Sequence, residues 1–317
     1  MSDKIYLISF VFPVFNEEKN LAKLYHEVKK VCIQHEIDYE MIFVDNGSVD
    51  NSLALLKEFK IQDKKVGYIA LSRNFGHQGA LFAGMTYAAG DAVITMDADL
   101  QHPPSLIPEM VKLWKEGAEV VYTIKKESNL RGRKYFFVKC FYWLISKLSG
   151  LNFNFGQSDF RLLDRKVLKI ILQIPEYHKF LRGQIEWVGF SQKSLSYDVD
   201  RRYSGESKFS YKNLFSFAFD GIFAFSKSPL HLLTLIGIVI SIISFFYILF
   251  VATLWTLQKF NIATNIILLP GWSTLIVAIL FLGSLQLVMM GILGEYISRV
   301  YDQVKGRPVF IIREMSV

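Results

Sequence analysis

The sequence predicts an α/β domain with a mostly parallel, Rossmann-like sheet, followed by a hairpin of two transmembrane helices. Two observations predict this architecture. In residues 1–125, short β-rich runs alternate with helical patterns, which is typical of a sheet with helices on both faces. Further along, two uncharged stretches are each longer than the ~20 residues that a spanning helix needs. A chain of 317 residues has room for both parts.

Five strands and four helices are expected in the first part of the chain. The strands are residues 6–12, 39–44, 66–71, 92–96 and 120–124, and the helices are residues 17–34, 51–59, 78–89 and 105–115. Ligands of such sheets bind at the carboxyl ends of the strands. Each of these positions contains polar or acidic residues: residues 13–17, 45–48, 72–74 and 97–99.

The two spanning helices are predicted at residues 232–257 and 272–293, separated by the turn at Pro270-Gly271. Lys259 is the only charge near the loop between them, whereas basic residues flank the outer ends: Lys227, Arg299, Lys305, Arg307 and Arg313. This distribution favours two cytoplasmic ends. The alternative is a buried hairpin in a soluble protein, but two such long uncharged runs are rare in soluble cores.

Composition and charge narrow the function classes. A hydrophobic content of 51% exceeds that of most soluble domains, and the net charge of +7 predicts an anionic partner, which is nucleic acid, acidic lipid or a phosphorylated substrate. Cys32 and Cys140 are the only cysteines and lack metal-ligand spacing. The N-terminus lacks the pattern of a secretory signal. We therefore expect the first domain in the reducing cytoplasm.

The predicted boundaries place the α/β domain in residues 1–210, a juxtamembrane amphipathic helix in residues 211–228, the hairpin in residues 230–297 and a basic cytoplasmic tail in residues 298–317. Basic and aromatic residues together also predict an interfacial helix around residues 131–149, with rings inserted in the headgroup region and cations near lipid phosphates. Ordinary packing against the sheet or between subunits is the alternative for both amphipathic segments.

Asp97 and Asp99 emerge from the end of a predicted strand, with Gln101 close behind. Hard cations such as Mg²⁺ and Mn²⁺ take oxygen ligands and keep positions for phosphate oxygens, so this pattern suits a diphosphate leaving group. A lone Asp-x-Asp is a weak signal, because acidic residues also cap helices.

Several further motifs accompany this pattern, at residues 14–20, 44–50, 71–76, 97–104 and 158–165. Together and in this order, they make the chain resemble the family 2 glycosyltransferases of the GT-A fold. The resemblance is to the subgroup that makes polyprenyl-phosphate monosaccharides, namely bactoprenol glucosyltransferases and, more distantly, dolichol-phosphate mannose synthases. The helical hairpin and the basic tail match as well, so the resemblance covers nearly the whole chain.

The resemblance implies a set of donor-binding residues. Those expected to bind the nucleoside are Pro13, Phe15, Glu17 and Asp45, with the Asp45 carboxylate accepting from the uracil N3–H. The Asp-Asp pair that is usual in the family is Asp45-Asn46 here, which leaves open which of the two side chains faces the base. Arg73 is expected to support the donor diphosphate or neighbouring carboxylates, with a purely structural ion pair as the alternative.

The remaining roles are implied in the same way. Asp97 is expected to face the sugar or ribose and contribute to the metal site, which Asp99 and Gln101 form around Mg²⁺ or Mn²⁺. Residues 198–208 resemble a loop that closes over the donor phosphates, with Arg202 and Lys208 as phosphate ligands, although a solvated basic loop is the alternative.

The acceptor end of the site is predicted around Asp159, which matches the position of the family's general base. A phosphate monoester is already largely ionised near neutral pH, with a second pKa of about 6, so Asp159 is expected to orient the acceptor or remove its last proton. Attack at the anomeric carbon is expected to be direct and inverting. The acceptor phosphate or lipid headgroups are expected to meet Arg131, Arg133 and Lys134.

The predicted reaction is therefore transfer of one sugar from a UDP-sugar, with UDP-glucose favoured, to undecaprenyl phosphate at the inner membrane, by a multi-pass homotetramer. UDP-N-acetylglucosamine, UDP-galactose and a modified pentose remain alternative donors. A processive polysaccharide synthase would carry Gln-x-x-Arg-Trp, whereas residues 184–187 read Gln-Ile-Glu-Trp. Nucleic acid is not an expected partner, and the first turn lacks the Gly-x-Gly-x-x-Gly of dinucleotide-dependent oxidoreductases.

Overall fold

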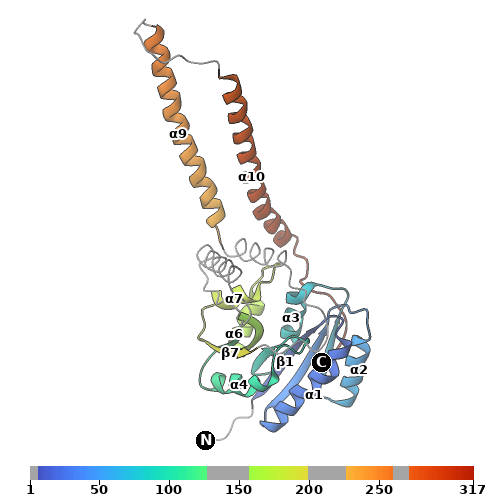
Figure 1. Ribbon diagram of the computed structural model, residues 1–317. Helices are drawn as coiled ribbons and strands as arrows, with labels where there is room; N and C mark the ends of the chain where they lie inside the picture. Colours follow the sequence, from blue (N-terminus) through green and yellow to red (C-terminus); the bar gives the residue numbers. More distant parts are fainter. Residues whose placement is uncertain (1–5, 127–156, 199–225, 260–270) are drawn as a thin grey trace.

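The computed structural model describes residues 6–126, 157–198, 226–259 and 271–317. Within these ranges the protein consists of an α/β domain and two long helices that extend away from it (Figure 1). The first and last residues of this helical pair both lie at the α/β domain.

An eight-stranded sheet forms the centre of the domain, in the order β7-β5-β6-β4-β1-β2-β3-β8. Its strands are β1 (Leu7–Val14), β2 (Asp38–Asp45), β3 (Val66–Leu71), β4 (Ala92–Thr95), β5 (Val120–Lys126), β6 (Gln157–Asp164), β7 (Gln192–Asp198) and β8 (Ile312–Ser316). Only β6 and β8 run antiparallel to their neighbours in this sheet. The prediction of a mostly parallel α/β sheet is therefore confirmed.

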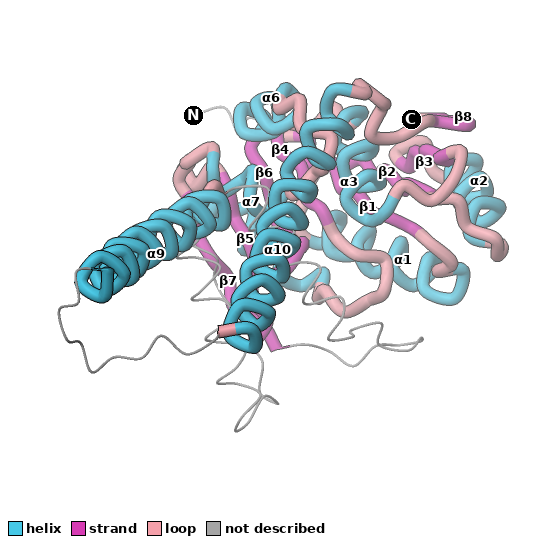
Figure 2. The backbone as a smooth tube through the Cα atoms, turned by 90° about the horizontal axis from the view of Figure 1, so that it is seen from above, coloured by secondary structure: helices cyan, strands magenta, loops and turns pink. Residues whose placement is uncertain are grey.

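Helices cover both faces of the sheet, with α1 and α3 on opposite sides of β1 (Figure 2). The helices of the domain are α1 (Glu18–Gln34), α2 (Ser52–Gln62), α3 (Gly76–Tyr87), the 3-10 turn η1 (Pro104–Leu106), α4 (Ile107–Lys115), α6 (Arg165–Gln173) and α7 (Leu181–Trp187). The elements predicted between residues 6 and 124 are all present, with ends displaced by a few residues. We had not predicted β6, β7, α6 or α7.

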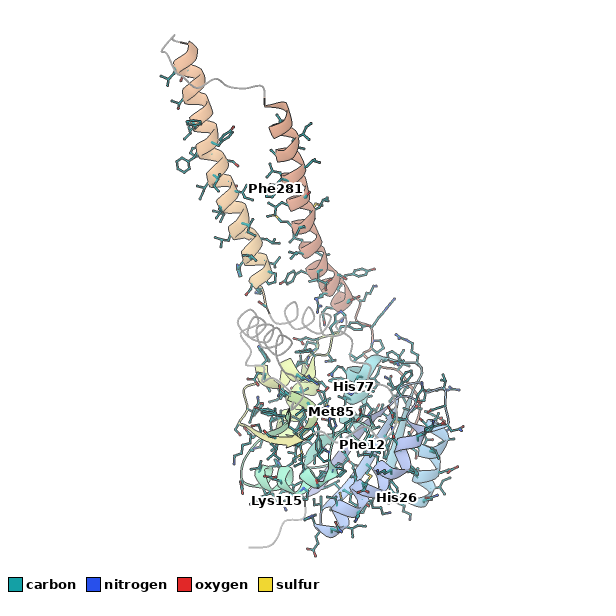
Figure 3. All side chains as sticks on the ribbon, in the orientation of Figure 1. Phe12, His26, His77, Met85, Lys115 and Phe281 are labelled. Atoms are coloured by element: carbon teal, nitrogen blue, oxygen red, sulfur yellow. The ribbon has the colours of Figure 1, made fainter. Side chains whose placement is uncertain are left out.

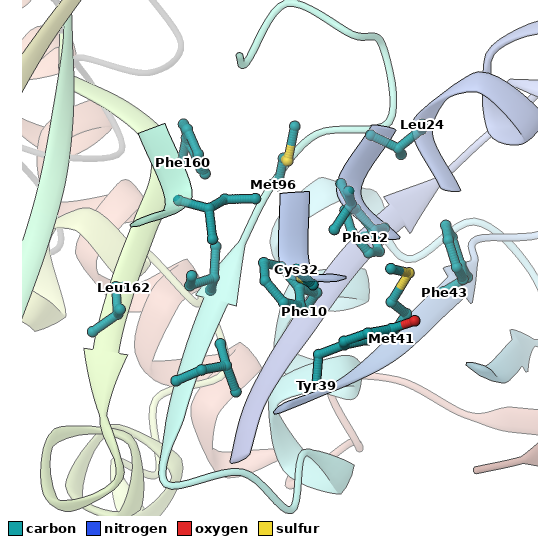
Figure 4. Close-up of a cluster of buried hydrophobic side chains, with 14 of the residues drawn as sticks. Phe10, Phe12, Leu24, Cys32, Tyr39, Met41, Phe43, Met96, Phe160 and Leu162 are labelled. Carbon is teal, nitrogen blue, oxygen red and sulfur yellow. The ribbon is translucent and has the colours of Figure 1, made fainter. Parts of the chain in front are cut away.

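The alternation of side chains along the strands produces two separate cores. Phe10 and Phe12 of β1 point to the face that α1, α2 and α4 cover, whereas Val11 points to the face of α3, α6 and α7. Phe12 stacks on Phe43 of β2 with 4.7 Å between the ring centroids, and Figure 4 shows this cluster with Leu24 of α1 beside it. Because both faces of the sheet are buried, the central strands are runs of apolar residues. These packed strands give a rigid support to the residues that follow them.

Gly84 allows α3 to lie close against β1 and β2. A Cβ atom at this position would collide with Cγ1 of Val11 and lie 2.9 Å from Cγ2 of Val44. We therefore expect Gly84→Ala to lower the free energy of unfolding by about 1–3 kcal/mol, although alanine is the better helix former. Thermal unfolding in detergent would measure this. Gly294→Ala is the matched control, since its Cβ meets no described atom within 4 Å; equal effects of the two changes would contradict the packing argument.

The last strand of the sheet, β8, lies in the segment for which we predicted only a basic tail. It pairs antiparallel with β3, and the Ser72 N–H donates to Ile311 O over 2.9 Å. Phe310 packs edge-on against Phe82 of α3, and Lys57 of α2 pairs with Glu314 over 2.6 Å. The segment after the helical pair thus returns to the domain and becomes part of its sheet.

The two long helices are α9 (Ser228–Lys259) and α10 (Trp272–Val304). Both contain stretches long and apolar enough to cross a membrane by length and composition, at Ser228–Tyr247 and Ala278–Val304. Their apolar side chains, such as Phe281, project outward along both helices (Figure 3). The helix α10 continues about three turns past residue 293, where we predicted its spanning part to end.

The end of α10 is joined to the α/β domain by side-chain hydrogen bonds. The Gln303 amide accepts from Tyr177 N and donates to Pro175 O, each over 2.7 Å. His178 lies 3.1 Å from Asp302. These contacts hold α10 against the loop that leads into α7.

Candidate active site

The candidate site lies where β1, β2 and β4 end and β6 begins. The antiparallel register of β4 and β6 pairs Thr95 with Arg161, so continuing it by two residues brings Asp97 opposite Asp159. The two carboxylates come from sequence-distant motifs, and the sheet alone brings them together. His77, on the first turn of α3, lies at the end of the domain that faces the long helices (Figure 3).

Asp97 is held between two histidines. Nε2 of His77 lies 2.8 Å from Oδ1 of Asp97. His102 is buried, its Nδ1 accepts from the Asp97 N–H over 3.2 Å, and its Nε2 lies 3.7 Å from Oδ2 of Asp97. The ring of His102 stacks on Phe160 of β6 at 5.2 Å. Burial raises the pKa of Asp97, but the neighbouring His102 and His77 outweigh burial and lower this pKa to about 2.

A tight turn follows Asp97. Oδ1 of Asp99 accepts from the Gln101 N–H over 3.1 Å, and Leu100 between them has a φ of 61°. A branched side chain in this left-handed region costs roughly 1–2 kcal/mol, so the rest of the fold must impose the conformation. The strain is localised in the segment for which we predicted metal ligands.

Asp159 forms a bidentate ion pair with Arg182 of α7. Nε and Nη2 of Arg182 donate to the two carboxylate oxygens over 2.7 and 3.0 Å. Nη2 of the buried Arg161 lies 3.5 Å from Oδ1, and Nδ1 of His77 lies 3.9 Å from Oδ2. Burial raises the pKa of Asp159, but Arg182, Arg161 and His77 outweigh burial and hold this pKa far below the ordinary range. A carboxylate held in this way is a poor proton acceptor near neutral pH.

The β1–α1 turn forms the other end of the site. Asn16 has a φ of 57°, its N–H donates to Oγ of Ser48, and its side-chain oxygen accepts from Val49 N. Glu17 N donates to Oγ of Ser52 over 3.0 Å. These bonds tie the turn after β1 to the turn after β2. Phe15, 36% exposed, lies beside them on the surface of the domain.

Asp45 and Asn46, at the end of β2, have different partners. Oδ1 of Asp45 accepts from Ser48 N within its own turn. The Asn46 amide instead bridges to the β3–α3 loop, where it accepts from Phe75 N over 2.8 Å and donates to Gly76 O over 3.1 Å. Asn46 thus fixes the loop that carries His77, which leaves Asp45 as the candidate for the base contact. Both nucleotide-binding assignments stay predictions.

The remaining predicted donor residues lie at the same edge. Pro13 pairs with Val44 of β2 but lies beyond Val11, the last residue of β1 that pairs with β4, so its missing N–H removes no bond to β4. The guanidinium of Arg73 stacks on Phe75 at 4.2 Å, and Nη1 donates to Asn74 O over 3.0 Å. No carboxylate in the described part of the chain lies within 4.0 Å of Arg73. The alternative of a structural ion pair for Arg73 is thus not found there, and its role at the diphosphate stays a prediction.

Several predicted contacts lie outside the described residues: Arg131, Arg133, Lys134, Arg202 and Lys208, together with the interfacial helix around residues 131–149 and residues 211–225 of the juxtamembrane helix. Conversely, the site contains four side chains to which we had assigned no role, namely His77, His102, Arg161 and Arg182. His102 and Arg161 lie inside quoted motifs, and His77 directly follows one. Arg182 lies two residues before the stretch 184–187 and outside all the quoted motifs.

The residues around Asp99 fit a divalent cation. Asp97 and Asp99 would provide carboxylate oxygens and Gln101 an amide oxygen, which are the hard ligands that Mg²⁺ and Mn²⁺ prefer; this ligand set stays a prediction. Among the described residues, no group of three or more His, Cys, Asp or Glu side chains is arranged to hold a metal ion alone.

The pKa of His77 gives a testable pH dependence. Burial alone would lower this pKa, but the hydrogen bond to Asp97 and the charges of Asp97 and Asp159 outweigh it and raise the pKa to about 9. Because the folded-state pKa exceeds the unfolded value of about 6.5, the stabilisation is fully present below pH 6.5 and is lost as the pH rises through 9.

We therefore expect the Tm of the metal-free wild-type protein to be higher than that of the His77→Gln variant, and this difference in Tm to shrink between pH 6.5 and pH 10. Thermal unfolding across this range would measure the difference, with His26→Gln, at the opposite end of the domain (Figure 3), as the control. A difference between wild type and His77→Gln that stays constant with pH would contradict the charged pair.

The chain is similar to glycosyltransferases over nearly its whole length. Residues 9–172 match the family model of glycosyl transferase family 2. The chain is 41% identical over 310 residues to the glycosyltransferase YkcC of Bacillus subtilis, covering 96% of this chain and 93% of the relative. It is 37% identical over 308 residues to a prophage-derived bactoprenol glucosyl transferase of Shigella flexneri, covering 97% of each.

The fold also has a counterpart among solved structures. A mannosyltransferase from Pyrobaculum calidifontis, solved in complex with GDP-mannose and Mn²⁺, matches with a TM-score of 0.50 at 14% identity, over 70% of this chain and 64% of that one. This likeness supports the GT-A-like sheet. The chain belongs to glycosyl transferase family 2 and is a glycosyltransferase.

Proposed function

We propose that the protein transfers a single sugar, preferentially glucose, from a UDP-sugar to the phosphate of a polyprenyl phosphate at the cytoplasmic face of the membrane. The product is a polyprenyl-phosphate sugar for glycosylation of the cell envelope. The observation that carries this proposal is the end-to-end match to a bactoprenol glucosyl transferase, which includes the two long apolar helices. A membrane-resident acceptor explains why a transferase domain carries such helices.

The donor is proposed to lie across the ends of β1, β2 and β4, with its base near Phe15 and Asp45 and its sugar near Asp97. A divalent cation held by Asp99 and Gln101, with Asp97 beside it, would stabilise the negative charge of the departing UDP. Arg202 and Lys208 are proposed to close over the diphosphate. Binding the donor here places its anomeric carbon near the start of β6.

The acceptor supplies its own nucleophile. A phosphate monoester oxygen attacks the anomeric carbon as the bond from this carbon to the β-phosphate oxygen breaks, and UDP leaves with the electron pair. The phosphate dianion needs no deprotonation. This agrees with the carboxylate of Asp159, both oxygens of which already accept from Arg182. Direct attack inverts the anomeric centre. The contribution of this chain is to orient the two anions and offset their charge.

The membrane arrangement is part of the proposal. The helices α9 and α10 are proposed to span the inner membrane, with the α/β domain and both ends of the chain in the cytoplasm. The basic residues Lys227, Lys305 and Arg307 lie at the ends of α9 and α10 nearest the domain, which supports this orientation. His77, which belongs to the candidate site, lies at the end of the domain nearest these helices (Figure 3). A homotetramer remains a prediction.

A transfer assay tests the proposed function. Purified protein in detergent is incubated with Mg²⁺ or Mn²⁺, undecaprenyl phosphate and a panel of radiolabelled UDP-sugars, and label in the organic phase is counted. We expect UDP-glucose to give the highest signal. Transfer of N-acetylglucosamine, galactose or a pentose instead would correct the donor. UDP binding without any label in the organic phase would contradict the acceptor and reopen the processive synthase.

A further inference from the structure

Two guanidinium groups and one imidazole ring surround Asp159 on one face of the sheet. Arg161 follows it by two residues on β6 and points to the same face, Arg182 reaches it from α7, and His77 reaches it from α3. Asp97, which also contacts His77, is the second carboxylate of this cluster. The two guanidinium groups match the two carboxylates in number, and the His77 ring lies between the carboxylates.

The side chains of Arg161, Arg182 and His77 differ in how far they are exposed to solvent. The Arg161 side chain is 3% exposed, so it is a buried counter-charge beneath Asp159. The side chains of His77 and Arg182 are 42% and 23% exposed and lie at the surface of the site. These two are therefore the cations of the cluster that a ligand can reach.

Charge decides what such a ligand must be. A phosphate dianion approaching Asp97 and Asp159 would meet two carboxylates, and like charges a few ångströms apart cost several kcal/mol when partly desolvated. Cations at the surface of the same cluster reverse this repulsion. A hydroxyl acceptor would instead need a basic carboxylate, whereas both oxygens of Asp159 already accept from Arg182.

We infer that Arg182 and His77 bind the phosphate of the acceptor, and that Asp159 serves to hold the Arg182 guanidinium in position. The inference rests on the proposed function and names the site at which its nucleophile is bound. The bidentate pair fixes the plane of the guanidinium before substrate arrives, which reduces the ordering needed on binding. The phosphate oxygen then lies beside Asp97, where the sugar is proposed to be.

Kinetics of Arg182→Gln, Arg182→Lys and His77→Gln test this. Farnesyl phosphate and undecaprenyl phosphate, each in detergent without phospholipid, are varied at fixed UDP-sugar, and the UDP-sugar is then varied at fixed acceptor. We expect Arg182→Gln to raise KM for both acceptors by about 10- to 100-fold, the loss of a hydrogen bond to a charged group. Arg182→Lys should recover part of this loss and His77→Gln should show a smaller rise.

Two controls separate binding from folding. UDP affinity, measured by calorimetry, should match wild type in both Arg182 variants, which would show that the donor site is intact. Arg165→Gln is the matched arginine control: Nη1 of Arg165 donates to Ala88 O at the opposite end of β6. We expect this variant to keep the wild-type KM for both substrates.

The outcomes are distinct. If wild type transfers no sugar to either acceptor, the proposed function fails and the inference with it. If wild type is active and Arg182→Gln keeps its acceptor KM, the inference alone is overturned and the acceptor is bound elsewhere. A rise in KM for the UDP-sugar instead would assign Arg182 to the donor diphosphate. A rise that appears only when phosphatidylglycerol is added would assign it to lipid headgroups.

Discussion

Replacing Asp99 with asparagine is expected to lower kcat roughly a thousandfold, the equivalent of about 4 kcal/mol in the activation barrier. The substitution keeps the shape of the side chain and one oxygen acceptor for the Gln101 N–H, so the turn around Leu100 should persist. It removes the negative charge that would hold a divalent cation against the leaving diphosphate. Counting label in the organic phase at increasing Mn²⁺ would measure both the loss and any residual dependence on the metal.

Asp38→Asn is the matched control for this change. Asp38 starts β2 at the opposite edge of the sheet, where its exposed carboxylate pairs with Lys65 over 2.6 Å. Surface pairs of this kind contribute about 1 kcal/mol or less, so the control should keep wild-type activity. If Asp99→Asn retained most of its activity at every metal concentration, the metal site at the end of β4 would be disproved.

Asp159→Ala is expected to reduce both stability and turnover. The substitution leaves Arg161 buried without a carboxylate partner. It also leaves the guanidinium groups of Arg161 and Arg182 near each other without the negative charge that both contact. Removing one partner of a buried ion pair costs about 3–5 kcal/mol, which would lower Tm by roughly 10 °C in a domain of this size. Turnover should fall far more than donor affinity, because Asp159 lies at the acceptor end of the site.

Thermal unfolding, transfer kinetics and UDP calorimetry would separate these effects. In the double variant Asp159→Ala, Arg161→Leu, the uncompensated buried charge is absent. We therefore expect this variant to recover most of the loss in Tm, while its turnover stays low. Equal losses of turnover and UDP affinity in the single variant would contradict the assignment of Asp159 to the acceptor end. An unchanged Tm would contradict the buried-pair argument.

The central sheet could be predicted from the sequence because each of its strands has a clear local pattern of apolar residues. Residues 41–44 and 92–95 form uninterrupted buried runs, and each is followed by a turn and a helical pattern. The end strand β8 was missed for the opposite reason. It is only five residues long, contains the adjacent charged residues Arg313 and Glu314, and gains its strand conformation from pairing with β3.

The same distinction applies to the site. Asp97 and Asp99 were predicted because they directly follow a strand, and Asp159 because it lies in a recognisable motif. His77 and Arg182 were missed because their contacts are tertiary: His77 is 20 residues from Asp97, and Arg182 is 23 residues from Asp159. Nothing in the local pattern around Arg182 marks it as a partner of a carboxylate on another element. Only the register of β4 and β6 and the packing of α7 bring these groups together.

The position of β8 in the chain has a consequence for biosynthesis. A ribosome makes β8 only after both α9 and α10, so the backbone groups of β3 that pair with β8 have no strand partner until the hairpin has been synthesised. An unpaired strand edge is a template for aggregation. Insertion of the hairpin during translation would hold the nascent domain at the membrane surface during this interval, and the last few residues would then close the sheet. With the proposed membrane arrangement, maturation of the enzyme would in this way be coupled to insertion of its hairpin.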